Sequence, residues 1–273
     1  MIRFAVLAVT LLAAACSDAA PASDPAEVAG PAAPAVARAP ATEPSRVRAT
    51  AGRIEEESDL LEFTYAWPAE ASAVPMIVER FREEARTAQA EASEAAREDK
   101  AARAPDAPTF NGHHYSKEWE TTGQTPRLLS LAALFSTFTG GAHPNSGFDI
   151  LIWDRAADRE VAFADLFVDP AAAFRLLEPA YCAELDKQRA EKRQETLPLK
   201  KEPDDWMTAC PKLAQAPVAL IDADRDGRFE GIRVLLGPYE AGPYAEGAYE
   251  IDIILGDEVR ASAKEQYRGS FAS

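Results

Sequence analysis

Alternating apolar and polar positions mark the first strong element of the chain. Four large apolar residues occupy every second position of residues 60–67: Leu61, Phe63, Tyr65 and Trp67. A period of two is typical of a half-buried strand, because successive side chains in a strand point to opposite faces. We therefore expect the folded region to begin here.

Two later segments show the spacing of helices. Pro75 opens an Ala-, Glu- and Arg-rich segment that runs to residue 103, and residues 170–194 form a second one. The apolar residues that repeat at helical spacing are Ile77, Phe81 and Ala85 in the first segment, and Phe174, Leu177, Tyr181 and Leu185 in the second. Pro179 lacks a backbone N–H, so we expect it to kink or divide the second helix.

Further strands are expected towards the C-terminus. Residues 127–154 read as two strands around the stretch "TGGAHPN" at 139–145, residues 216–236 as strand, turn and strand, and residues 247–255 as a last strand. Strands mixed with a few helices predict an α+β fold, with antiparallel-rich mixed sheets packed by two main helices.

The N-terminus carries the pattern of a secreted protein. Residues 1–15 contain Arg3, a short apolar run and small residues, which predicts a signal peptide. The segment "AAAC" resembles the lipobox of bacterial lipoproteins, so we expect Cys16 to be lipidated; an ordinary signal with an incidental cysteine is the alternative. By resemblance to lipoprotein sorting rules, Ser17 indicates the outer membrane, facing the periplasm. Residues 16–52 are rich in Ala and Pro and predict a flexible tether.

The net charge narrows the classes of possible partner, and the cysteines indicate the cellular compartment. The chain carries a net charge of −16, which becomes −17 when cleavage removes Arg3, and such a surface repels nucleic acid and attracts basic partners. Apart from Cys16, two cysteines remain, Cys182 and Cys210. In an oxidising compartment they predict one disulfide, against the alternative of two separately buried thiols.

The stretch "TGGAHPN" holds His143, one of three histidines. Two adjacent glycines permit positive φ, and Pro144-Asn145 favours a turn, so we interpret the stretch chiefly as a backbone device. His143 is a structural histidine, a contact residue or a metal ligand in our three hypotheses. A zinc site shared with His113-His114 is disfavoured, because adjacent strand residues point to opposite faces.

Asp222, Asp224 and Asp226 precede Gly227 in the pattern of the first half of a calcium loop. The twelfth position of that loop is Arg233 instead of an acidic residue, so a charged β-turn is favoured over weak calcium binding. No other metal or cofactor pattern is present, and neither a G-x-S-x-G nor a phosphate-binding motif occurs. Glu55, Glu56 and Glu57 are expected to be solvated at the end of the tether. We expect no catalytic residues.

Tyr239 and Tyr244 lie in a segment punctuated by proline and glycine, "GPYEAGPYAEG". Tyrosines on a loop are amphipathic enough to meet a ligand or to pack on the sheet. Both are candidate contact residues, together with His143.

Three segments in order carry a family resemblance: "FSTFTGGAHPNSGFDILIWD" at 135–154, "VAFADLF" at 161–167 and "GPYEAGPYAEGAYEIDI" at 237–253. They resemble the bacterial lipoprotein family with the domain of unknown function 3298, preceded by its companion domain 4163. Phe138 departs from the tyrosine that is common in the family. The resemblance implies a 4163-like subdomain at residues 53–155 and a 3298-like subdomain at residues 156–273.

Similar modules occur in a lysozyme-sensing anti-sigma factor and beside a peptidoglycan deacetylase domain. The resemblance therefore implies a cell-envelope module that binds a wall component, such as peptidoglycan, or a cationic envelope protein such as lysozyme. A hydrolase of wall polymer and a structural envelope lipoprotein are the alternatives. We expect the chain to be attached to the membrane through its lipid anchor.

We predict that cells fed a fatty-acid analogue label the wild-type chain but not Cys16→Ala, because the acyl chains attach to this cysteine. The measurement is incorporation of the analogue into the purified protein. Equal labelling of both chains would rule out the lipid anchor.

Overall fold

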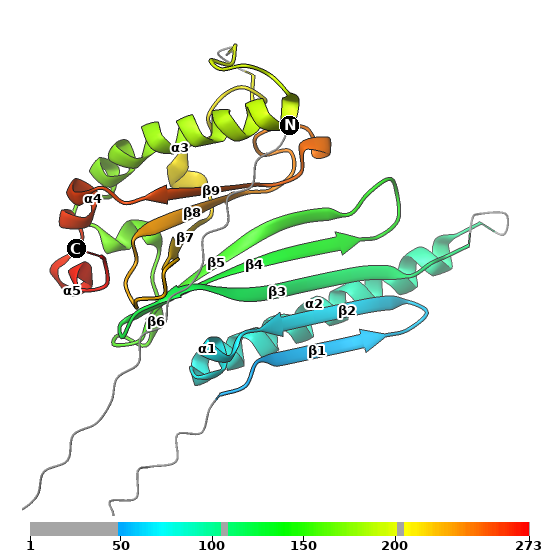
Figure 1. Cartoon of the computed structure of the whole chain (residues 1–273). Coiled ribbons are helices and arrows are strands. Elements are labelled where there is room, and N and C mark those ends of the chain that lie inside the picture. The colour runs from blue at the N-terminus through cyan, green and yellow to red at the C-terminus, as the bar shows by residue number, and fades with distance from the viewer. Residues whose placement is uncertain (1–48, 105–108, 201–204, 273) are drawn as a thin grey trace, which may run out of the picture. The chain divides into compact units, whose positions relative to one another are not determined.

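Within the residues that the structure describes, six strands lie in chain order in the larger of two sheets (Figure 1). The structure is a computed structural model and describes residues 49–104, 109–200 and 205–272, so the predicted signal peptide and Cys16 lie outside it. Neighbouring strands are antiparallel except β2 and β3, which are parallel and are joined through two helices. The elements are β1 (Gly52–Glu57), β2 (Leu61–Trp67), α1 (Ala69–Ser72), α2 (Pro75–Ala102), β3 (His113–Gln124), β4 (Leu128–Phe138), β5 (Asn145–Asp154) and β6 (Arg159–Glu160).

The alternating residues of β2 pack under α2, as their pattern predicts. Their side chains are buried, and α2 contacts β2 and β3 through Ile77, Phe81 and Ala85. Phe81 also stacks on Trp119 of β3, with 4.7 Å between the ring centroids. The period of two in the strand and the helical spacing in α2 thus belong to one core.

Strand β1 corrects the prediction for the end of the tether. Glu55, Glu56 and Glu57 are strand residues, and β1 pairs along its whole length with β2. Ile54 packs against the core below α2, while Arg53, Glu55 and Glu57 face solvent. A charged face is common on an edge strand, because it discourages pairing with other chains. The same charges give this segment the composition of a linker.

The second sheet has three antiparallel strands in the described part of the chain, and α3 lies against β9. Helix α3 continues through Pro179, so the expected division does not occur. Leu177 and Tyr181 are buried on either side of it, and their packing offsets the missing hydrogen bond. The elements are η1 (Phe163–Leu166), α3 (Pro170–Arg193), η2 (Leu213–Gln215), β7 (Val218–Ile221), β8 (Gly231–Leu236), η3 (Tyr244–Glu246), β9 (Tyr249–Ile254), α4 (Asp257–Ala261) and α5 (Glu265–Arg268).

The two sheets pack on each other where β7 meets β3, β4 and β5. Leu128 belongs to the core beneath α3, whereas its neighbours Leu129 and Leu131 belong to the core beneath α2. A strand buried on both faces reads as a continuous apolar run, which explains why residues 128–133 contain a single polar residue, Ser130. The fold is α+β, as the sequence predicts.

The described residues, from residue 49 onward, form one compact unit. The division into residues 53–155 and 156–273 stays a prediction, although the larger sheet ends close to that boundary, at Glu160. Of the helices described, none is long and apolar enough to cross a membrane.

Side-chain hydroxyls join the edge strand β7 to the larger sheet. Leu220 donates its backbone N–H to Ser130 Oγ at 2.9 Å and accepts a hydrogen bond from Thr122 Oγ1 at 2.8 Å. Gly123 permits this approach, since a Cβ there would lie 2.8 Å from Asp222 N. Both polar groups of a buried edge residue are therefore paired without a neighbouring strand.

We predict that Ser130→Ala lowers the free energy of unfolding by about 1–3 kcal/mol, because the buried N–H of Leu220 loses its acceptor. Ser136→Ala, on the same face of β4 but half-exposed, is the matched control and should change it much less. The measurement is urea unfolding followed by circular dichroism. Equal losses in both variants would contradict the role of Ser130.

Candidate functional site

The stretch "TGGAHPN" forms the loop between β4 and β5 and the first residue of β5. Gly140 and Gly141 have φ of +97° and +104°, and neither has a heavy atom within 4 Å of where a Cβ would stand. Space is therefore available, but the backbone conformation is one that L side chains rarely adopt. The glycines act as the backbone device that the sequence predicts.

The three predicted contact residues meet at one place. His143 stacks on Tyr244, with ring centroids 3.7 Å apart and an angle of 18° between the planes. The hydroxyl of Tyr239 lies 3.4 Å from Nε2 of His143, and its ring lies 5.8 Å from that of Tyr244. We call these three side chains the aromatic cluster. Residues about a hundred positions apart in the chain thus form one surface.

The aromatic cluster borders a cleft between the two sheets, which we call the inter-sheet cleft. Its volume is about 700 Å³. The larger sheet contributes Glu118, Glu120, Leu134 and Phe148; the second sheet and its loop contribute Leu235, Glu250, Pro238 and Tyr244. Leu134 remains 51% exposed although it is a large apolar side chain. The cleft combines carboxylates with an apolar floor.

Arg189 holds the loop that carries Tyr239 and Tyr244. This fully buried side chain of α3 donates two hydrogen bonds to the carbonyl oxygen of Ala241, at 2.9 and 2.7 Å. It also donates to the carbonyl oxygens of Thr208 and Ala209, at 3.1 and 2.9 Å. Burial and the nearby Arg193 lower the pKa of Arg189 from its ordinary value. The β8–β9 loop is therefore fixed on α3 and not free to swing.

The predicted disulfide is confirmed. Cys182 of α3 is bonded to Cys210, and their Cα atoms are 5.6 Å apart. The bond ties the segment that Arg189 also holds, so α3, residues 205–210 and the β8–β9 loop form one supported region.

The aspartate-rich turn is organised by hydrogen bonds to its own backbone. Asp222 accepts from the N–H of Gly227 at 3.1 Å, Asp224 from the N–H of Asp226 at 3.1 Å, and Asp226 from the N–H of Arg228 at 2.8 Å. Among the described residues, these aspartates are the only three possible metal ligands whose ligand atoms all lie within 4.8 Å of one another. The hydrogen bonds fit the charged turn that the sequence favours, and calcium binding stays an untested alternative.

The first two histidines have different ion-pair partners, although both line one hollow along α2. His113 is buried with Nε2 3.4 Å from Asp99 Oδ2. His114 is half-buried with Nδ1 3.5 Å from Glu62 Oε2. The two side chains therefore serve different local contacts.

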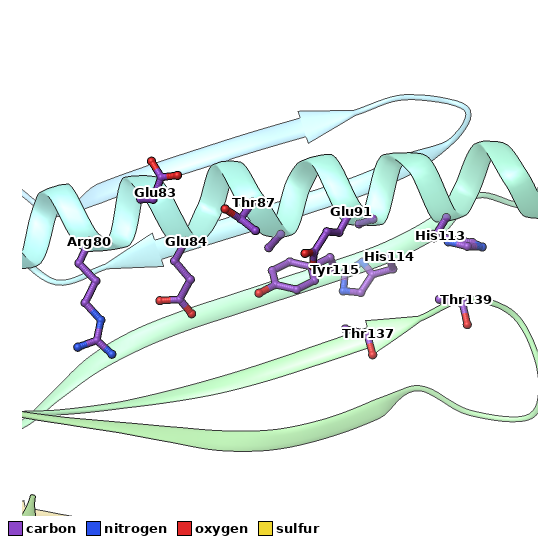
Figure 2. A pocket seen from close by; sticks show the side chains of 13 residues that line it. Arg80, Glu83, Glu84, Thr87, Glu91, His113, His114, Tyr115, Thr137 and Thr139 are labelled. Atoms are coloured by element: carbon purple, nitrogen blue, oxygen red, sulfur yellow. The ribbon is translucent and has the colours of Figure 1, made fainter.

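A second hollow, which the sequence did not predict, runs along α2 above β3 and β4 (Figure 2). We call it the α2 groove, and its volume is about 850 Å³. Helix α2 contributes Arg80, Glu83, Glu84, Thr87, Ala88, Glu91, Ala92 and Ala95, and the strands contribute His113, His114, Tyr115, Thr137 and Thr139. The sequence already shows these α2 residues at helical spacing. Only the position of the strands in the structure shows what the residues face.

A buried lysine supports the wall of the α2 groove. Lys117 has a side chain only 6% exposed and forms ion pairs with Glu84 and with Asp149, the latter at 2.6 Å. Glu84 also accepts a hydrogen bond from the hydroxyl of Tyr65 at 3.0 Å, and Lys117 lies over the ring of Trp119. Paired charges of this kind are held rigidly, because each loses much if its partner moves.

A family model matches the N-terminal part of the folded region. Residues 54–146 match the model described as Deacetylase PdaC, and all residues that line the α2 groove lie within this region. A solved structure of a DUF3298 family protein from Pseudomonas aeruginosa PAO1 is similar, with 19% identity, 82% of this chain and 97% of that chain covered, and a TM-score of 0.48. A DUF3298 member from Bacteroides fragilis NCTC 9343 shows 16% identity, 81% and 95% coverage, and a TM-score of 0.47. No curated protein matches the chain.

We predict that Gly140→Ala lowers the free energy of unfolding by about 1–2 kcal/mol, because alanine is strained at positive φ. Gly269→Ala is the matched control, since Gly269 has equal space but a helical φ of −67°. His143→Ala should cost less than Gly140→Ala. Thermal unfolding of the three variants measures the order, and a larger loss for His143→Ala would show that the ring, not the backbone, supports the loop.

Proposed function

We propose that this chain is a non-catalytic binding module of the cell envelope, and that its inter-sheet cleft takes a cationic envelope protein such as lysozyme. The observation that carries the proposal is the lining of the cleft. Glu118, Glu120 and Glu250 border an apolar floor, and the arginines that pair with Glu118 and Glu250, Arg53 at 3.4 Å and Arg233 at 3.7 Å, lie outside the lining. Carboxylates beside an apolar surface suit a partner that presents basic and apolar side chains together.

The exposed part of the floor favours a protein partner. Leu134 faces Glu118 in β3 and Phe148 in β5, so one apolar side chain lies between a carboxylate and a ring. An exposed apolar residue of this size within a recess contributes contact area when a partner covers it. The net charge of −16 would raise the association rate with a basic partner.

The aromatic cluster extends the same surface. Tyr239 is 55% exposed and has a φ of +71°, a conformation that a non-glycine residue adopts at a cost. Residues in costly conformations gather at binding and active sites, and tyrosine is common where proteins meet. Because Arg189 already fixes the loop, binding would cost little conformational entropy there.

The envelope location rests on other observations. The disulfide between Cys182 and Cys210 is typical of an oxidising compartment. The predicted anchor at Cys16 would place the module on the outer membrane, facing the periplasm, where wall components and basic defence proteins are both met.

We predict that the full chain, in a nonionic detergent, binds lysozyme in a calorimetric titration at about 150 mM salt. Glu120→Gln should weaken binding by about fivefold or more, since it removes a charge from the cleft, and Leu134→Ala should weaken it similarly. Glu178→Gln, an exposed glutamate of α3 outside the lining, is the matched control.

Four results would contradict this proposal. Binding that disappears completely at moderate salt, or that responds equally to Glu120→Gln and Glu178→Gln, indicates only general charge attraction. Heat with peptidoglycan fragments but not with lysozyme would assign the cleft to a wall polymer. Turnover of those fragments would make the protein a hydrolase.

A further inference from the structure

The α2 groove is a second site, formed on the other face of the larger sheet from the inter-sheet cleft. Side chains alternate along β3, so Glu118 and Glu120 line the cleft while Tyr115 and Lys117 lie on the side of α2. With about 850 Å³, the groove has the size of a small-molecule site. The side chains that line the groove indicate which kind of ligand it would bind.

Negative charge exceeds positive charge around the ring of Tyr115. Lys117 is one cation between two carboxylates, Glu84 and Asp149, which leaves one negative charge in surplus. Glu91 adds another, and Figure 2 shows Glu84 and Glu91 projecting from α2 on either side of the Tyr115 side chain. Burial, followed by Glu84, Asp149 and Glu91, raises the pKa of Tyr115 to about 12, as expected where carboxylates surround a phenol.

Small side chains leave the hollow beside these charges. Ala88, Ala92 and Ala95 follow one another at helical spacing along the wall of the groove. They offer methyl groups to a ligand and no hydrogen-bonding group. The wall therefore suits an aliphatic chain that runs parallel to α2.

We infer that the α2 groove binds a linear alkylammonium ligand. One ammonium group lies between Glu91 and the ring of Tyr115, where a carboxylate and an aromatic face both attract a cation. The aliphatic chain lies along the alanine wall. Lys117 is a positioning residue, because its ion pair and the hydroxyl of Tyr65 hold Glu84 in place.

Calorimetry on the full chain in nonionic detergent tests this inference, with spermidine as the probe. We expect one spermidine to bind per chain. Glu91→Gln should raise the dissociation constant at least about tenfold, and Glu98→Gln should change it less than about twofold. Glu98 is an exposed glutamate on α2 beyond the lining, so both variants remove the same charge from the same helix. Neither position is buried, so both variants should fold.

Two further titrations decide the source of the ammonium group and its necessity. Acetyl-trilysine amide presents the same group on a peptide. If only spermidine binds, the natural ligand is a free amine. If the peptide also binds and depends equally on Glu91, the ligand is a lysine side chain. Pentane-1,5-diol has an aliphatic chain without charge and should not bind. The inference is overturned by the absence of binding to both amines, by binding of the diol, or by equal weakening in Glu91→Gln and Glu98→Gln. These outcomes are independent of the lysozyme titration.

Discussion

The rest of the structure depends on the contact between Leu220 and the hydroxyls of Thr122 and Ser130. Leu220 lies in an edge strand, whose backbone groups would be buried without partners if the second sheet simply rested on the first. The hydroxyls supply those partners and thereby set where β7 crosses β3 and β4. Because β8 and β9 follow from β7 by pairing, the same contact determines how far Glu250 lies from the carboxylates of β3.

Both candidate sites depend on the alternation of β3 and β4. The strands present one set of side chains to the second sheet and the other set to α2, so two hollows on opposite faces share one sheet. Each hollow is supported from behind by a cation: Arg189 for the loop of the aromatic cluster and Lys117 for Glu84. A buried cation with several partners is costly to move, and such support gives a binding surface its defined shape.

The fold was predictable where one period dominated. The period of two in β2 and the helical repeat in α2 each report a single buried face, and the disulfide followed from two cysteines in a chain predicted to be secreted. Prediction failed at β1, where charged residues cover an edge, and the division expected at Pro179 does not occur, because packing on both sides outweighs a lost hydrogen bond. In both places tertiary contacts overrode the local pattern.

By itself the sequence determined the residue types of the aromatic cluster, the strained glycines and the excess of negative charge, because each is a property of a residue or of a total. It did not determine that His143 meets Tyr239 and Tyr244, nor that Glu91 of α2 and Tyr115 of β3 line one groove. Those neighbours come from segments far apart in the chain. Only the crossing of two sheets and the docking of α2 decide which of them share a surface, because local periodicity records which face is buried but not what covers it.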